Sequence, residues 1–440
     1  MKKFLGVTGW AAALALGGTI LMSNSSAQTE ETYPDTLTNL RMLGDVMEHI
    51  RENYVDEVNE KDLIEAAIQG MLTSLDPHST FLPPSDFEDM QQDTKGEFGG
   101  LGIEVTMEDG WVKVVSPIDD TPAYKAGIEA GDYITHLDGE PVQGLTLDQA
   151  VERMRGMVGE DIVLTIARKG QEPFDVTITR DTIKMRAVRY RMEDDDVGYI
   201  RISRFSEQTQ PGLDKALKRL KEESEGNLKG YVLDLRNNPG GLLNQAISVS
   251  DTFLERGIVV STRGRDGRDA QDFRAGAGDD ADGLPIVVLI NGGSASASEI
   301  VAGALQDHGR AIIMGTKSFG KGSVQSIMPL SYGDAAIKMT TQRYYTPSGD
   351  SIQATGIEPD ILVEQARLET VESRFRTQES DLRNSLKNPD GEEDEGANDG
   401  TTEPEEETAE DNSNEIQDYQ LEQAVRMVKG VSIFQNMDEN

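Results

Sequence analysis

The chain has 440 residues, a net charge of −37 and no cysteine. This length is enough for two or three domains with sizeable cores. The strongly acidic balance argues against nucleic acid and anionic lipid as partners, because both repel a negatively charged surface. The absence of cysteine excludes thiol nucleophiles, thiolate metal sites and disulfide bonds.

The amino terminus has the pattern of a secretory signal peptide. Two lysines follow Met1, an apolar stretch runs from Phe4 to Met22, and Ser25-Ser-Ala27 supplies small residues for cleavage after Ala27. The sequence therefore predicts a signal peptide at residues 1–27 and export to the periplasm of a Gram-negative bacterium, with no membrane span left after cleavage. An uncleaved membrane anchor is the alternative, since the apolar stretch is nearly long enough to cross a bilayer.

Residues 28–94 are expected to form a helical arm. Apolar residues recur at helical spacing and predict two amphipathic helices, at Thr36–Tyr54 and Glu60–Ser74. Two interpretations remain open. The arm is either a helical hairpin packed on the next domain or a segment for oligomerisation.

Residues 95–181 have the pattern of a small β-rich module. The segment opens with Phe98-Gly-Gly-Leu-Gly-Ile103, continues through short apolar runs, and contains a predicted helix at Leu147–Met154. This order resembles a PDZ domain. The resemblance implies that backbone N–H groups bind the terminal carboxylate of a peptide, which adds a strand to the sheet edge. The residues of this loop are Gly100, Leu101, Gly102 and Ile103.

Residues 182–365 alternate strand-like and helical patterns, which predicts a layered α/β domain. Strands are expected at 199–202, 231–235, 286–290, 311–314 and 323–328, and helices at 212–223, 242–254 and after Ser296. Residues 366–440 form a tail. Its stretch at 390–415 is acidic, with twelve acidic residues and no basic one between Gly391 and Glu415, so it cannot bury enough apolar surface to fold. A last amphipathic helix is predicted at 416–430.

Two small-residue loops carry the candidate chemistry. The first, Asn291-Gly-Gly-Ser-Ala-Ser-Ala-Ser-Glu299, places three serines between an apolar strand and a helix. A serine hydroxyl needs a base to take its proton. His308 lies twelve residues after Ser296 in the same predicted helix, about 18 Å away, which excludes direct contact. Asp307 is excluded as the base for the same reason. None of His49, His78 and His136 has a local sequence context that indicates a catalytic triad.

The second loop, Phe319-Gly-Lys-Gly-Ser-Val-Gln325, isolates Lys321 between two glycines that allow close approach of another segment. A lysine acts as a base near neutral pH only when it is desolvated. If Lys321 to Gln325 is a strand, both side chains share one face, and Gln325 would orient the amine. An exposed lysine in a hairpin is the alternative that spacing alone leaves open.

Backbone N–H groups near both loops are candidates for an oxyanion hole, which acyl transfer requires. Ala297 lies at a predicted helix N-terminus, where the helix dipole favours negative charge. Gly240 or Gly241, in Asp234-Leu-Arg-Asn-Asn-Pro-Gly-Gly241, would supply the second donor. The alternative for these glycines is a tight turn.

Five motifs together resemble those of the carboxyl-terminal processing peptidases, also called tail-specific proteases. They are Gly293-Ser-Ala-Ser-Ala-Ser-Glu299, Phe319-Gly-Lys-Gly322 with Gln325, Asp234-Leu-Arg-Asn-Asn-Pro-Gly-Gly241, Leu75-Asp-Pro-His-Ser79 and Tyr345-Thr-Pro-Ser-Gly349. The resemblance extends from about Leu37 to Val363. It implies an α/β core like that of Clp protease and crotonase, preceded by an inserted PDZ domain.

The resemblance also implies roles for individual residues. Ser296 would be the nucleophile, Lys321 the base and Gln325 its support, without metal or cofactor, in a serine endopeptidase that cuts envelope proteins with a nonpolar C-terminus. Ser298 is then expected to cap the helix. A homo-oligomer built through the terminal helices and an activating adaptor are the expected partners besides the protein substrates.

Two departures and one alternative function accompany this interpretation. Asp350 stands where the family often has a basic residue, and the acidic stretch after Pro389 has no counterpart in the family pattern. The alternative is a non-catalytic PDZ adaptor or chaperone on a degenerate protease core. Such a core would be expected to lack at least one of the serine, lysine and glutamine, and all three are present. Small-ligand binding by the core has no nucleotide or metal signature to support it.

Overall fold

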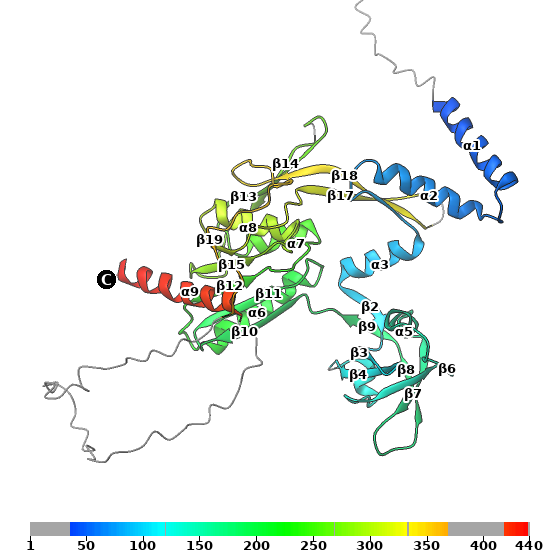
Figure 1. Ribbon diagram of the computed structural model, residues 1–440. Coiled ribbons are helices and arrows are strands. Elements are labelled where there is room, and N and C mark those ends of the chain that lie inside the picture. Colours follow the sequence, from blue (N-terminus) through cyan, green and yellow to red (C-terminus); the bar gives the residue numbers. More distant parts are fainter. Residues whose placement is uncertain (1–35, 119, 268, 332–333, 368–417, 439–440) are drawn as a thin grey trace, which may run out of the picture. The chain divides into compact units, whose positions relative to one another are not determined.

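The computed structural model describes residues 36–118, 120–267, 269–331, 334–367 and 418–438 (Figure 1). The predicted signal peptide and the acidic stretch at 390–415 lie outside these residues. The chain divides into two compact units, residues 1–68 and 69–440. The first contains α1 (Thr36–Asn53) and the start of α2 (Glu60–Thr73), so both predicted arm helices are present.

A six-stranded sheet forms the centre of the second unit. Its order is β10-β11-β12-β15-β16-β19, in which β10 and β11 are antiparallel and the remaining pairs are parallel. The bounds are β10 (Val188–Glu193), β11 (Val197–Ile202), β12 (Gly230–Asp234), β15 (Ile286–Ile290), β16 (Ile312–Gly315) and β19 (Ile361–Leu362). The prediction of a layered α/β fold is confirmed.

Helices cover both faces of this sheet because its inner strands are apolar on both sides. In β12, Tyr231 and Leu233 join the core under α6 (Thr209–Glu223), α7 (Leu243–Asp251) and α8 (Ala297–Asp307), whereas Val232 faces the other way. There it packs with apolar residues of α9 (Tyr419–Asp438), the red helix of Figure 1. The last predicted helix therefore exists and completes the second face of the sheet.

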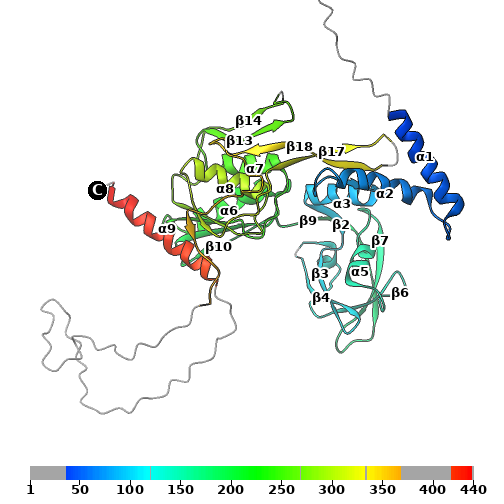
Figure 2. The same ribbon diagram turned by 45° about the horizontal axis from the view of Figure 1, so that its top comes forward.

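A second sheet is organised around the long strand β18 (Ala336–Tyr345), the yellow ribbon of Figure 2. Strand β17 (Ser323–Pro329) pairs with it, as do β1 (Thr80–Leu82) near its start and β13 (Gly257–Gly264) near its end. Strand β14 (Gln271–Ala275) extends the sheet from β13.

The β-rich module has its own sheet and core. The sheet order is β3-β4-β5-β7-β8, with β6 paired to β5, so β3 is a terminal strand of this sheet. The predicted helix at Leu147–Met154 is α5, which Thr146 and Gln149 cap reciprocally. The other elements between Pro84 and Lys184 are α3 (Pro84–Lys95), β2 (Glu97–Gly100), β3 (Ile103–Glu108), β4 (Trp111–Pro117), α4 (Pro122–Lys125), β5 (Tyr133–Leu137), β6 (Glu140–Pro141), β7 (Asp161–Ala167), β8 (Phe174–Thr179) and β9 (Asp181–Lys184).

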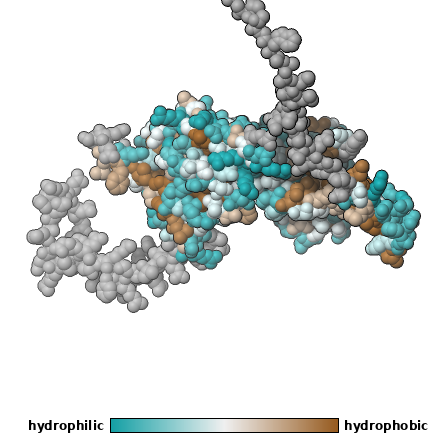
Figure 3. All heavy atoms as spheres, turned by 90° about the horizontal axis from the view of Figure 1, so that it is seen from above, coloured by the Kyte–Doolittle hydropathy of each residue, from teal (hydrophilic) through white to brown (hydrophobic). Residues whose placement is uncertain are grey.

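The surface mixes polar and apolar residues, with brown atoms in separate groups on the face seen in Figure 3. Several large apolar side chains near the end of α9 are exposed: Ile433, Phe434 and Met437. Of the helices in the described ranges, none combines the length and the hydropathy that crossing a bilayer requires.

Candidate active site

The serine loop connects the C-terminal end of β15 to the start of α8, and the outer serines hold it in place. The Ser294 hydroxyl donates to Leu235 O (2.8 Å) and accepts from Asn291 N (3.0 Å). The Ser298 hydroxyl donates to Asn238 O (2.9 Å), so the expectation that Ser298 caps the helix is wrong. Both serines tie the loop to the segment after β12 and leave Ser296 at the N-cap position.

Ser296 has an uncommon backbone conformation, with φ +57° and ψ −111°. A positive φ is unfavourable for a residue with a Cβ atom, and such residues concentrate at functional sites. Gly240 lies directly against this residue, because a Cβ atom added there would be 2.9 Å from Ser296 Cβ and 2.8 Å from Ala295 O. The glycine is therefore required for the approach of the two loops.

The carboxylate of Glu299 joins the serine loop to the lysine loop. It is fully buried and accepts four hydrogen bonds: from Ser296 N (2.7 Å), Ser318 Oγ (2.6 Å), Gly320 N (2.6 Å) and Lys321 N (2.9 Å). One side chain thus fixes the backbone of both candidate catalytic residues. The spacing Ser-x-x-Glu indicates a capping box, which predicts the first of these bonds, but the bonds to the lysine loop have no sequence signal.

Ser296, Lys321 and Gln325 all line one cavity of about 720 Å³. Burial lowers the pKa of Lys321, and the nearby charge of Lys338 lowers it further, while Glu299 and Asp76 act in the opposite direction. The net decrease favours the neutral amine that a base requires. The desolvation expected from the sequence is therefore present.

Tyr344 of β18, which the sequence analysis did not single out, lies beside the Ser296 hydroxyl, and this hydroxyl lowers the pKa of Tyr344. Burial raises the pKa of Tyr344 to about 12, so the phenol stays protonated. Within the described ranges no hydrogen bond joins Ser296 to Lys321. Catalytic hydrogen bonds are often longer before substrate binds, so the missing bond is compatible with a Ser296–Lys321 pair. Tyr344 had no local signal because only the strand register brings it to the serine.

The candidate oxyanion-hole N–H groups of Ala297, Gly240 and Gly241 differ in availability. Ala297 N is the first amide of α8 and has no partner within the helix. The Gly240 N–H donates to Asn238 Oδ1 (2.9 Å), whereas no hydrogen bond from Gly241 N occurs in the described part of the chain. Of the two glycines, the geometry thus favours Gly241 as a donor to an oxyanion.

The motif Leu75-Asp-Pro-His-Ser79 also reaches the site, although it is distant in sequence. Burial, with Lys321 next, lowers the pKa of His78, and Asp76 raises the pKa of Lys321. His78 therefore lies within electrostatic range of the lysine, a context that its sequence neighbours do not reveal. The other three histidines are elsewhere: His49 in α1, His136 in β5 and His308 at the end of α8.

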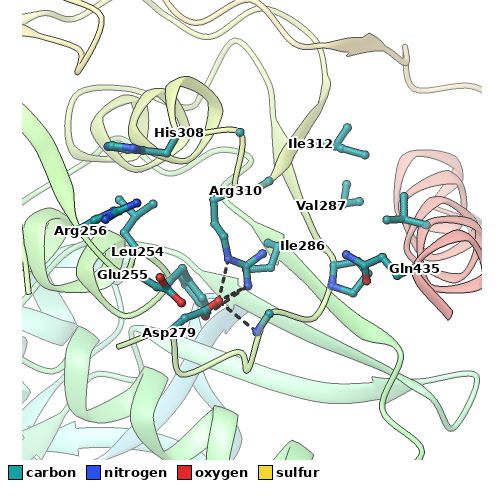
Figure 4. Close-up of a pocket in the computed structure, with 16 residues that line it drawn as sticks. Leu254, Glu255, Arg256, Asp279, Ile286, Val287, His308, Arg310, Ile312 and Gln435 are labelled. Carbon is teal, nitrogen blue, oxygen red and sulfur yellow. Dashed lines mark hydrogen bonds and ion pairs between the residues drawn. The ribbon is translucent and has the colours of Figure 1, made fainter. Parts of the chain in front are cut away.

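A second cavity, of about 450 Å³, lies at the N-terminal ends of β15 and β16 (Figure 4). The charged pair Asp279 and Arg310 is joined there at 2.9 Å, and His308 Nε2 contacts Ile258 O at 2.7 Å. The serine loop follows the opposite, C-terminal end of β15. The structure therefore agrees with the exclusion of His308 as the base.

Hydrogen bonds to its carbonyl groups hold the glycine loop of the β-rich module in place. Leu101 O accepts from Ala123 N (2.9 Å), and Gly102 O accepts from Ile118 N (2.8 Å) and Thr121 Oγ1 (3.0 Å). Gly102 has φ +76°, and a Cβ atom there would collide with Thr121 at 2.3 Å. The loop precedes the terminal strand β3, which is the arrangement that strand addition needs.

Comparison with known proteins agrees with this architecture. The family model described as peptidase family S41 matches residues 196–363, and a PDZ domain model matches residues 113–168. The model of the activating protease CtpB N-terminal domain matches residues 7–84. The fold and the site thus define a peptidase with a PDZ domain.

Curated relatives narrow the class. The carboxy-terminal-processing protease of Bartonella bacilliformis is 54% identical over 371 residues, which is 84% of this chain and 85% of the relative. That of Synechocystis sp. is 38% identical over 379 residues, with 81% and 87% covered. This chain therefore belongs to the carboxy-terminal processing proteases of peptidase family S41. A solved photosystem II D1 C-terminal processing protease is 28% identical and covers 74% of this chain and 92% of its own, with a TM-score of 0.43.

Proposed function

We propose that the chain is an exported serine endopeptidase in which Ser296 and Lys321 form the catalytic dyad and Gln325 supports the lysine. Ser296 Oγ attacks the scissile carbonyl carbon while Lys321 Nζ takes the hydroxyl proton. The lysine then returns this proton to the leaving amine, and water hydrolyses the acyl-enzyme by the same route in reverse. The N–H groups of Ala297 and Gly241 stabilise the oxyanion, with Gly240 holding the loops together.

A single observation carries this proposal: the strained serine and a lysine of lowered pKa line the same cavity and share one buried clamp, Glu299. The alternative of a degenerate core with an adaptor role lacks such support. A non-catalytic protein has no need for a desolvated lysine, a strained serine and two unoccupied N–H groups in one place.

The test compares wild type with Ser296→Ala, Lys321→Ala and His78→Ala. The substrate is a folded reporter protein with a nonpolar C-terminal tail, and mass spectrometry identifies the new termini. We expect no cleavage by the first two variants and retained cleavage by His78→Ala, because His78 has no hydrogen bond to Ser296 in the described chain. Cleavage by Ser296→Ala would refute the role of Ser296 as the nucleophile. A dead His78→Ala with an active Lys321→Ala would make the histidine the base.

We propose further that Gly100, Leu101, Gly102 and Ile103 bind the substrate's terminal carboxylate. The anchored carbonyl groups of the loop and the terminal position of β3 support this role. Amidation of the reporter's C-terminus removes the carboxylate and should raise KM. An unchanged KM would refute the role.

The location, domain limits and partners complete the proposal. We place a signal peptide at 1–27, the arm at 28–94, the PDZ domain at 95–181, the protease core at 182–365 and the tail at 366–440. The apolar amino-terminal stretch and the lack of cysteine support a periplasmic location. The match of residues 7–84 to an activating protease's N-terminal domain supports an adaptor or a homo-oligomer through the arm. Cell fractionation and analytical ultracentrifugation test these points.

A further inference from the structure

The motif Leu75-Asp-Pro-His-Ser79 has no role in the proposed chemistry, yet it is anchored beside it. The motif directly precedes β1, which pairs with the first part of β18 through Thr80 and Lys338. Two residues beyond Lys338 in β18, Thr340 N donates to the hydroxyl of Ser79, the residue before Thr80 (3.1 Å). The loop therefore continues along β18 on the side where β1 pairs.

The carboxylate of Asp76 organises this loop. It accepts from His78 N (2.8 Å), from Ser79 N (2.9 Å) and from the Ser79 hydroxyl (2.7 Å). A fourth bond comes from the Thr340 hydroxyl (3.2 Å). Burial opposes ionisation, but these hydrogen bonds outweigh it and lower the pKa of Asp76. An ionised carboxylate can only accept hydrogen bonds.

The direction of the next hydrogen bond follows from this charge. Thr340 Oγ1 has one proton, and Asp76 takes it. Its oxygen must therefore accept from the next group, Gln325, which lies opposite Thr340 across β17 and β18. Gln325 Nε2 donates to Thr340 Oγ1 (3.3 Å) and to Ser323 Oγ (2.9 Å). Both amide protons are thereby used.

We infer that Asp76, acting through the Thr340 hydroxyl, fixes the amide orientation of Gln325 so that its carbonyl oxygen, not its amino group, is presented to Lys321. A flipped amide would offer N–H donors to an amine that must donate its own N–H and aim its lone pair at Ser296. The carbonyl oxygen accepts from Lys321 and leaves the lone pair directed at the serine. Asp76 and Thr340 are thus positioning residues. The inference rests on the proposed role of Lys321 and Gln325.

A second feature explains how the register makes this relay possible. The pairing of β17 with β18 shifts between Val324 and Gln325, so Gln325 pairs with Thr340 instead of Thr341. Ser326 Oγ then contacts Thr341 Oγ1 at 2.7 Å, away from Asp76. Without this irregularity, Gln325 would face a threonine that has no carboxylate behind it.

The test is a double-mutant cycle with a conservative control. Thr340→Val removes the hydroxyl at nearly constant volume, and Thr340→Ser retains it. Each is made in wild type and in Gln325→Ala, and kcat and KM are measured on a peptide substrate. Loss of one oriented hydrogen bond predicts about a tenfold lower kcat for Thr340→Val, with KM unchanged and Thr340→Ser near wild type. In Gln325→Ala, Thr340→Val should cause no further loss, because its effect passes through the amide.

Asp76→Asn provides the second variant, since its amide can donate to Thr340 and reverse the relay. We expect a similar fall in kcat with KM unchanged. Equal losses from Thr340→Val in both backgrounds, or a wild-type kcat for both Thr340→Val and Asp76→Asn, would overturn the inference. Such results would not contradict the proposed Ser296–Lys321 dyad, because Ser296→Ala and Lys321→Ala test that proposal separately.

Discussion

The Glu299 clamp gives the sharpest prediction of the structure, tested by Glu299→Gln. The carboxylate accepts four hydrogen bonds on its two oxygens, whereas an amide has one acceptor oxygen and a donor nitrogen. In either orientation the new amino group faces a backbone N–H. At least one buried donor is then unsatisfied, at a cost of about 1–3 kcal/mol. The remaining bonds lose their charge assistance, about 1 kcal/mol each.

The sum is roughly 3–6 kcal/mol, which is the free energy by which the carboxylate holds the serine loop and the lysine loop together. We therefore expect at least a hundredfold loss of kcat in Glu299→Gln and faster hydrogen exchange at the amides of Gly320 and Lys321. The matched control is Glu358→Gln, which removes only an exposed ion pair with Lys317 and should change kcat little. A kcat for Glu299→Gln within threefold of wild type would refute the clamp.

Three further predictions follow from other parts of the molecule. The value of kcat/KM should rise with pH through the lowered pKa of Lys321. Lys338→Met should move this rise to higher pH, because losing the neighbouring positive charge favours the ammonium form of Lys321. A pH profile of the variant that matches the wild-type profile would contradict this. Leu421→Ala should lower the free energy of unfolding by about 2–5 kcal/mol in urea titrations, whereas Phe434→Ala, which is 72% exposed, should change it by less than about 0.5 kcal/mol. Gly102→Ala should weaken binding of a C-terminal peptide measured by calorimetry, because the Cβ atom would displace the loop from Thr121; unchanged affinity would show that the loop does not bind the carboxylate.

Local patterns predicted much of the fold. Helix α5 has the predicted bounds, and β15 does as well, because an amphipathic stripe and a bounded apolar run are local signals. Helix bounds elsewhere moved: α7 is shorter than the predicted 242–254, and α9 begins at Tyr419 and extends to Asp438. These ends depend on tertiary packing, which periodicity does not encode.

The sequence likewise predicted some residues of the site and not others. Ser296, Lys321 and Gln325 were expected from their motifs, and the cavity brings all three together. Tyr344 and Thr340 could not be expected, because a shift of one residue in the pairing of β18 would replace them with other side chains. Contacts that depend on strand register or on segments far apart in sequence need the folded structure.

The position of α9 late in the chain has a consequence for the order of synthesis. One face of the central sheet, including Val232, Val287 and Leu289, is covered by a helix that begins only at Tyr419. Arg236, in the same loop as Gly240 and Gly241, likewise forms an ion pair at 2.6 Å with Asp418, which is synthesised late. A ribosome therefore synthesises the serine loop and the lysine loop well before Asp418 and α9. The nascent enzyme should remain unable to cut until α9 has been made and has docked on the sheet.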